Sequence, residues 1–454
     1  MVSLTFHGGV NEIGGNKILL ENRDTRIWFD FGKSFTMGED YYTSWLQPQR
    51  SNGLKDYFEF NLLPRLPGLY AEDKLAQTEL KHEEPSYDGV FISHAHADHV
   101  THIQFIDPEI PVYTGAGTKL FMEAMEKTSS YANYGDHNYR TFRTGDKIRI
   151  DSLEIEPIHV DHSIPAAYGY IIHTPEGCVV YTGDLRAHGP RHDMTQEFLE
   201  AAEYNEPIAM ITEGTRMVRR GKRRHLSESQ VLNGVVKICQ EADKDGKAVF
   251  YTHGPRDMDR LRTFSVAAEG CGRKLVVNTR TAHLLHRLVE DQSLNLPDPF
   301  RDDTIAVYYK KKKSGTYSEK DYYLWERDFL EAIVTPEDLK KSPEEYVISL
   351  SFYDLVELID IRPEPGSPFI YSMSEHFGED DLEEKVMHNW LTHFSLRYHQ
   401  LHASGHLSRK ELAQAIETVN PNILFPVHTE NPEMFGELHR NPTPPVLGKQ
   451  YSLT

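Results

Sequence analysis

The stretch SHAHADHV, residues 93–100, decides how the rest of this chain is interpreted. It follows the apolar run GVFI, so its side chains come where a strand ends and a loop begins. His94, His96, Asp98 and His99 place three imidazoles and one carboxylate within six residues. These donors suit zinc or a similar borderline cation, and their density favours two metals rather than one. The alternative, a polar loop with chance histidines, is disfavoured by so dense a pattern after a strand.

The residues around this stretch alternate short apolar strand-like runs with turns, and later with helical runs. This pattern predicts an α/β protein. After Glu213 a basic cluster leads into an amphipathic helix, for which Ser227 and Gln230 are spaced as a capping box. Strand–helix units follow, and they indicate a second domain of parallel strands. A length of 454 residues also favours two domains over one core.

Composition limits the kind of protein. Hydrophobic residues make up 39% and charged residues 26%, and no apolar run reaches the length of a membrane span. The first residues carry no secretory pattern and the three cysteines lie far apart, so we expect a cytoplasmic protein. The net charge of -20 argues against a general polyanion binder. A nucleic-acid substrate would therefore need a local basic groove or cationic metals.

The H-x-H-x-D-H pattern resembles the metallo-β-lactamase superfamily, whose fold is a four-layer αββα sandwich with metals at one edge of its two sheets. The resemblance assigns three further strand-end residues. Asp30 would orient a ligand without binding metal, His162 would be a ligand, and Asp184 would bridge the metals. His159 is the competing choice for His162, and Asp184 taken alone could be a turn residue.

Three later positions resemble the added motifs of the β-CASP nucleases, which insert a second α/β domain into this fold. They are Glu213, His406 in HASGH, and His428 in PVH. Within that group, S-G-H followed by P-V-H resembles ribonuclease J, and the T-E-G-T form resembles its archaeal branch. The resemblance implies a metallo-β-lactamase domain over 1–205, an inserted β-CASP domain over 206–370, and completion of the first domain by 371–454.

The resemblance also implies the role of each site residue. Two divalent ions, most simply Zn²⁺ with Mn²⁺ or Mg²⁺ as alternatives, would be held by His94, His96, Asp98, His99, His162, Asp184 and His428. Catalysis would rest on Asp98, Asp184, Glu213 and His406. RNA phosphate would be held by His402, Ser404, Gly405, Ser372 and Ser374, the two serines departing from the expected glycine-and-proline form.

These assignments imply a metal-dependent ribonuclease that works mainly as a 5′ to 3′ exonuclease on single-stranded RNA with a 5′ monophosphate. No membrane partner is expected, and a homodimer is left open. Competing interpretations are a DNA-directed β-CASP nuclease, an endoribonuclease, a small-molecule hydrolase such as a thioesterase, and a non-catalytic RNA-binding subunit. The filled ligand positions disfavour the last, and the inserted domain with His428 disfavours the small-molecule hydrolase.

Two basic tracts lie in the expected inserted domain. One runs from Arg216 to Arg224, and the other is Lys310–Lys313 with Tyr308, Tyr309 and Tyr317 beside it. Each is either a solvated charge run or part of an RNA-tracking groove with stacking rings. The sequence does not separate these two interpretations.

Overall fold

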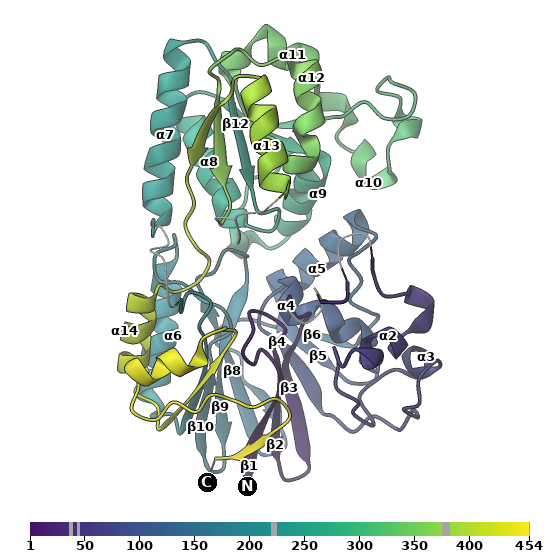
Figure 1. Cartoon of the computed structure of the whole chain (residues 1–454), viewed down its shortest axis with the longest axis vertical. Coiled ribbons are helices and arrows are strands. Elements are labelled where there is room, and N and C mark those ends of the chain that lie inside the picture. The colour runs from purple at the N-terminus through teal and green to yellow at the C-terminus, as the bar shows by residue number, and fades with distance from the viewer. Residues whose placement is uncertain (36–39, 43–45, 219–224, 375–381, 454) are drawn as a thin grey trace.

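A computed structural model describes residues 1–35, 40–42, 46–218, 225–374 and 382–453. Two of its sheets face each other in the lower half of Figure 1. The first contains, in spatial order, β20 (Gln450–Ser452), β1 (Val2–Gly8), β2 (Lys17–Asn22), β3 (Thr25–Phe31), β4 (Gly89–Ile92), β5 (Val112–Gly115) and β6 (Tyr139–Phe142). The second contains β19 (Ile423–Val427), β11 (Ala209–Glu213), β10 (Gly177–Tyr181), β9 (Ala167–Thr174), β8 (Leu153–Val160) and β7 (Ile148–Ile150).

Alternation along the strands builds the layers of this sandwich. Phe91 points into the core between the two sheets, whereas Val90 and Ile92 pack on the outer face of the first sheet. That outer face is covered by α2 (Lys55–Glu59), α3 (Glu72–Leu75), α4 (Ala97–Val100) and α5 (Ala116–Thr128). The second sheet is covered by α6 (His192–Tyr204) and α14 (Arg409–Val419). The predicted four-layer αββα arrangement is confirmed.

The third sheet forms the upper half of Figure 1, and all its strand pairs are parallel. Its order is β15 (Ile333–Val334), β14 (Ile305–Tyr308), β13 (Lys274–Asn278), β16 (Tyr346–Ser349), β12 (Val249–His253), β17 (Pro368–Ser372) and β18 (Arg397–Gln400). One face is covered by α7 (Glu228–Lys244), α8 (Met258–Gly270) and α9 (Thr279–Leu288), with α10 (Leu324–Arg327) at its edge. The other carries α11 (Pro336–Lys341), α12 (Leu358–Ile361) and α13 (Leu382–His393).

Strand pairing bears on where the two units meet. β11 pairs with β10 and β19 in the sandwich, so the first unit continues through Glu213. β18 pairs with β17 in the third sheet, which therefore continues to Gln400. We propose that the inserted unit starts after residue 213 and closes near residue 400, rather than spanning 206–370. The predicted capping box at the start of α7 is confirmed, with Ser227 and Gln230 as its partners.

The last part of the chain returns to the sandwich. In Figure 1 it runs down from the upper half, and α14 lies beside α6. β19 then pairs in parallel with β11, and β20 pairs antiparallel with β1. The sandwich is thus assembled from both ends of the chain around an inserted third sheet.

Candidate active site

The predicted ligands converge because several strands end at one edge of the sandwich. β10, β11 and β19 are parallel neighbours, so the residues that follow them emerge side by side. These residues are Asp184, Glu213 and His428, which are distant in sequence. β3 and β4 are also parallel, and they bring Asp30 and the 93–100 stretch to the same edge. Parallel pairing therefore explains how residues hundreds of positions apart share one site.

Residues 93–100 turn sharply from β4 into the short helix α4. His96 caps this helix in extended backbone conformation, and Asp98 and His99 lie buried in its first turn. Gly32 allows the close packing, since a Cβ there would lie 1.8 Å from the Asp98 carbonyl oxygen. Only glycine fits at that approach. The turn aims its four polar side chains from one short segment into one pocket.

Asp30 lies behind the ligands, fully buried. Its Oδ2 accepts from His99 Nδ1 at 2.7 Å and from the Tyr181 hydroxyl at 2.6 Å, while Oδ1 accepts from Ser93 N at 2.7 Å. Because Nδ1 of His99 donates to this carboxylate, its Nε2 faces the site. This is how a carboxylate behind a metal-binding histidine fixes its ring, the role predicted for Asp30.

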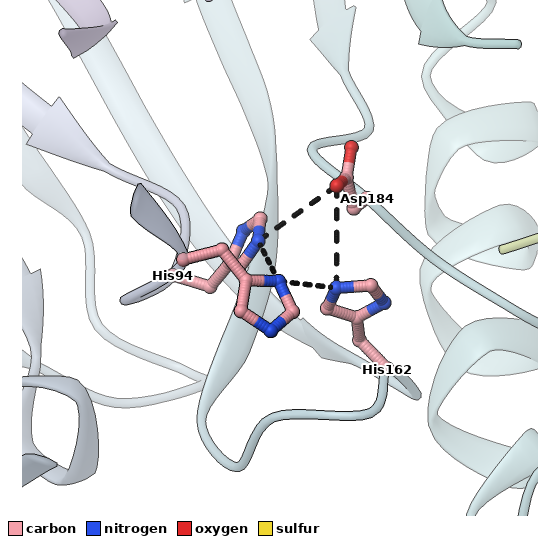
Figure 2. A group of neighbouring side chains, drawn as sticks. His94, His162 and Asp184 are labelled. Carbon is pink, nitrogen blue, oxygen red and sulfur yellow. Dashed lines mark hydrogen bonds and ion pairs between the residues drawn. The ribbon is translucent and has the colours of Figure 1, made fainter. Parts of the chain in front are cut away.

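The first ligand group comprises His94, His96, His162 and Asp184, whose donor atoms lie within 4.8 Å of one another. His96 Nδ1 lies 3.0 Å from His94 Nε2 and 3.0 Å from His162 Nε2. Figure 2 shows these rings and the Asp184 carboxylate pointing toward a common centre. Burial, followed by the charge of neighbouring histidines, holds the pKa of His94 and of His162 well below the ordinary value. Neutral rings offer lone pairs to a cation.

The second ligand group comprises Asp98, His99, Asp184 and His428, all buried. Asp184 Oδ2 is 3.1 Å from His99 Nε2 and 3.6 Å from His428 Nε2. His428 Nε2 is also 2.8 Å from Asp98 Oδ2. Burial lowers the pKa of His428, but Asp184 and Asp98 outweigh it and raise that pKa to about 9. The carboxylates thus draw positive charge to this position.

The donor set fits two divalent cations. Asp184 belongs to both groups, and its buried Oδ1 has no hydrogen-bond partner among the residues that the structure describes. Burying a carboxylate oxygen without a partner is costly unless a cation reaches it. Three imidazoles with one carboxylate, beside two imidazoles with two carboxylates, is chemistry that zinc accepts. His159 instead stacks on Tyr168 and is in neither group.

Glu213 and His406 meet beside Asp184, as the resemblance implied. His406 Nδ1 lies 3.3 Å from Glu213 Oε1 and 3.8 Å from Asp184 Oδ2. Glu213 also accepts from the backbone amides of Thr215 and Leu407. The buried carboxylate is therefore fixed in place, and it can orient the half-buried imidazole toward a substrate.

The 402–406 loop lies next to these residues. His402, Ser404 and Gly405 are only half-buried, so their polar groups are accessible. Burial, then the Arg260 charge, lowers the pKa of His402 to about 3, which keeps the ring neutral. The predicted phosphate contacts of this loop remain a prediction that its exposure supports.

The two serines predicted beside that loop differ. Ser374 is exposed. Ser372 is fully buried, and its hydroxyl donates to the Leu401 carbonyl while accepting from Arg260 Nη1. With its only O–H committed to backbone, Ser372 has no donor left for a phosphate. Its predicted direct contact with phosphate stays a prediction, which this geometry does not favour.

A buried charge network joins the two units, and sequence reasoning missed it. We call it the interdomain charge network: Asp161, Arg186, Glu228, Asp259 and Arg260. Arg186 Nη1 lies 3.1 Å from Glu228 Oε1, and Arg260 Nη2 lies 2.8 Å from the same oxygen. Only the position of Arg186, two residues after Asp184, could have drawn attention to it.

The two basic tracts differ in the partners of their charged side chains. Lys310 pairs with Asp354, Lys312 with Glu326 and Lys311 with Glu337, while the Tyr308 hydroxyl donates to Glu357. Carboxylates thus neutralise much of this tract, which favours the solvated-charge interpretation. In the other tract Arg216 contacts His225. The predicted cluster at residues 219–224 lies outside the described residues.

Comparison with known proteins places these features in context. Residues 66–254 match the family model described as beta-lactamase superfamily domain. Residues 393–436 match the Zn-dependent metallo-hydrolase RNA specificity domain. Within the described ranges, every helix is too short or too polar to traverse a bilayer.

Among curated proteins, the chain is 26% identical over 362 residues to ribonuclease J of Sinorhizobium meliloti, covering 77% of this chain and 59% of that protein. It is 23% identical over 439 residues to ribonuclease J of Helicobacter pylori strain J99, covering 94% of this chain and 56% of that protein. The chain thus spans under two thirds of the length of these relatives. The predicted resemblance to ribonuclease J is confirmed, whereas its archaeal branch stays a prediction.

A solved structure shares the fold. It is titled a crystal structure of a protein of unknown function from Enterococcus faecalis V583, with a TM-score of 0.77, 22% identity, and 99% of both chains covered. This likeness extends over both units of the chain and concerns the fold alone.

Proposed function

We propose that this chain is a metal-dependent ribonuclease that hydrolyses RNA phosphodiesters, acting mainly from the 5′ end. The observation that carries the proposal is the sharing of Asp184 between two ligand groups, one of which is completed by His428 from a segment that matches an RNA specificity domain. The likeness to ribonuclease J proteins points to the same substrate class. Zinc is the metal that the donor set favours.

The chain's own residues would divide the reaction as follows. When bound, divalent cations held by the two ligand groups would supply Lewis-acid activation of water and of the phosphate. The water oxygen would attack phosphorus and release its proton to bulk water, the bond to the 3′ oxygen would break, and that oxygen would take a proton. His406, oriented by Glu213 at 3.3 Å, is positioned to supply this proton. The released nucleotide carries the 5′ phosphate.

The 402–406 loop would hold the phosphate next to the scissile one. Its half-buried His402 and Ser404 offer an imidazole and a hydroxyl donor. A terminal monophosphate is more compact than a triphosphate, so we expect it to fit better beside these donors. A single-stranded RNA with a 5′ monophosphate is therefore the proposed substrate, and a homodimer remains a prediction.

The test is to incubate the metal-loaded protein with RNA labelled at its 5′ or 3′ end and carrying a 5′ mono- or triphosphate. We expect mononucleotide release from the 5′ end, faster from the monophosphate. His428→Ala should abolish cleavage, whereas Ser404→Ala should weaken the end preference roughly 10- to 100-fold, the size of one charge-assisted hydrogen bond.

The alternatives give different outcomes. Internal fragments without end preference would mean an endoribonuclease, and cleavage of DNA alone would mean a DNA-directed β-CASP nuclease. No cleavage of either polymer by protein that holds two metals would overturn the proposal.

A further inference from the structure

Arg260 of α8 is a fully buried arginine that reaches both segments predicted to hold RNA phosphate. Its Nη1 donates to the Ser372 hydroxyl oxygen at 2.5 Å and to the Ser372 carbonyl at 3.1 Å. Its Nη2 donates to the Ala403 carbonyl at 3.1 Å. One planar guanidinium therefore ties the end of β17 to the 402–406 loop, which lysine could not do with the same geometry.

Arg260 also packs against the ring of His402. Its Nη1 lies 3.3 Å from His402 Nδ1. The Ser372 carbonyl, which accepts from Arg260, also lies 3.3 Å from Nδ1. The guanidinium and this carbonyl therefore hold the Nδ1 edge of the ring in place.

The loop that follows is fixed through three successive carbonyls. The Ala403 carbonyl accepts from Arg260, that of Ser404 accepts from His188 Nε2 at 2.9 Å, and that of Gly405 accepts from His162 Nδ1 at 2.6 Å. With these acceptors used by the protein, the loop can offer donors to an anion. His162 belongs to the first ligand group, so the loop and the metal centre share a fixed spacing.

A second path connects Arg260 to the metal centre. Glu228 Oε1 accepts from Arg260 Nη2 at 2.8 Å and from Arg186 Nη1 at 3.1 Å. Arg186 in turn donates to Asp161 at 2.9 Å, and Asp161 directly precedes His162. Arg186 itself lies two residues after Asp184. The contacts of Arg260 therefore run without a gap from the 402–406 loop to the residues flanking the predicted ligands.

We propose that Arg260 is a positioning residue that sets the distance between the terminal RNA phosphate and the metal centre. This inference rests on the proposed function and deepens it. Arg260 does not contact substrate, since it is completely buried. It acts through Ser372, His402 and Ala403, and it thereby governs recognition of the 5′ end rather than the chemical step.

The experiment compares kcat/KM of metal-loaded variants on 5′-monophosphorylated and 5′-hydroxyl RNA of one sequence. In Arg260→Met we expect the ratio of the two rates to fall about tenfold or more. Cleavage of the 5′-hydroxyl RNA should change less than about twofold and both metals should remain bound. Arg260→Lys should restore part of the preference. The matched control is Arg262→Met on the same helix, whose guanidinium contacts Asp259 and the Leu294 carbonyl instead and should leave the ratio unchanged.

A merely structural role predicts something different. The inference would be overturned if Arg260→Met lowered kcat/KM equally on both RNAs, or if it left the ratio of the two values unchanged. If Arg260→Met does not fold, a double-mutant cycle of Arg260→Lys with Ser404→Ala decides the matter. The two changes should be strongly non-additive, because one acts through the loop that the other alters, and simple additivity would contradict the proposal.

Failure of the proposed function would be seen separately, as a wild-type protein that cleaves neither RNA. The inference can then still be tested by comparing the affinity for a 5′-phosphorylated phosphorothioate oligonucleotide with the affinity for its 5′-hydroxyl form. Equal preference in wild type and Arg260→Met would reject it on that measurement.

Discussion

Two groups of charged side chains lie side by side in this molecule. They differ in whether the protein itself supplies the partners of their charged and polar atoms. In the interdomain charge network each guanidinium faces carboxylates, and Glu228 accepts from both Arg186 and Arg260. In the metal centre, imidazole nitrogens face one another at 3.0 Å, and no group in the described part of the chain hydrogen-bonds to Asp184 Oδ1. Burial of charge is common to both. Unmatched lone pairs, rather than burial, mark the group that needs a ligand.

The change expected to affect the metal centre most is Asp184→Ala. It removes the carboxylate common to both ligand groups, so the protein should lose both metals and RNA cleavage should fall at least ~10³-fold. Elemental analysis and the cleavage assay measure the two effects. Asp259→Asn, which changes a half-buried acid of the charge network, is the control and should keep both metals. A metal content unchanged in Asp184→Ala would contradict the bridging assignment.

Glu228→Ala should break the other group instead. Removing the acceptor shared by Arg186 and Arg260 leaves buried charge without its partner, which costs about 3–5 kcal/mol of unfolding free energy. Denaturant unfolding measures this change, and metal content should stay the same. Glu228→Gln, which keeps the shape of the side chain, should cost less. An unaltered unfolding midpoint in Glu228→Ala would show that the network does not join the two units.

Asp30→Asn probes the edge of the metal centre. Asp30 accepts from His99 Nδ1, so its loss should weaken metal binding at the second ligand group about 10- to 100-fold. Competition with a chelator measures the affinity. Asp88→Asn is a matched control, because Asp88 also accepts a backbone amide at 2.7 Å but lies away from the site. Equal affinity in wild type and Asp30→Asn would remove Asp30 from its predicted role.

The most gradual expected effect is a pH dependence of the unfolding free energy that arises within the charge network. Burial raises the pKa of Asp259 to about 7, above its ordinary value of 3.8, even though Arg186 opposes this. The folded state therefore holds a proton that the unfolded state has released between about pH 4 and 7. Its contribution to the unfolding free energy falls as pH rises through this window, by at most ~1.4 kcal/mol per pH unit.

Asp259→Asn should lack this component of the slope. Urea unfolding of wild type and variant at pH 4.5, 6 and 7.5 checks it, with exposed Asp245→Asn as the control. A slope shared by all three proteins would mean that Asp259 is ionised across the whole range.

The sequence revealed the parts of the molecule that are local. GVFI followed by SHAHADHV predicts a strand end with ligands because four consecutive apolar or small residues lead directly into a stretch where four possible ligands fall within six residues. The contacts that the sequence could not reveal are long-range. Lys310 contacts Asp354, and the Ser372 hydroxyl donates to the Leu401 carbonyl. Both contacts depend on strand pairings that no local sequence pattern encodes. The same holds for Arg260, whose spacing in α8 gives no sign that it is fully buried.

The limits of the two units show the same difference between local sequence patterns and long-range contacts. A change of composition after Glu213 was visible, but β17 and β18 look like any other strand–helix unit. Only the pairing of β17 with β12, and of β18 with β17, assigns them to the inserted sheet. The ligand assignments themselves stay a prediction, which the two convergent groups support.

Because the chain returns to the sandwich only after the inserted unit, the residues of the metal centre are synthesised at different times. A polypeptide synthesised only as far as Gln400 already contains His94, His162 and Asp184, yet it lacks β19 and His428. Segments fold in the order in which they leave the ribosome. The second ligand group can therefore close only after the whole inserted unit has been synthesised. Until His428 is available, the carboxylate of Asp184 faces an incomplete set of donors.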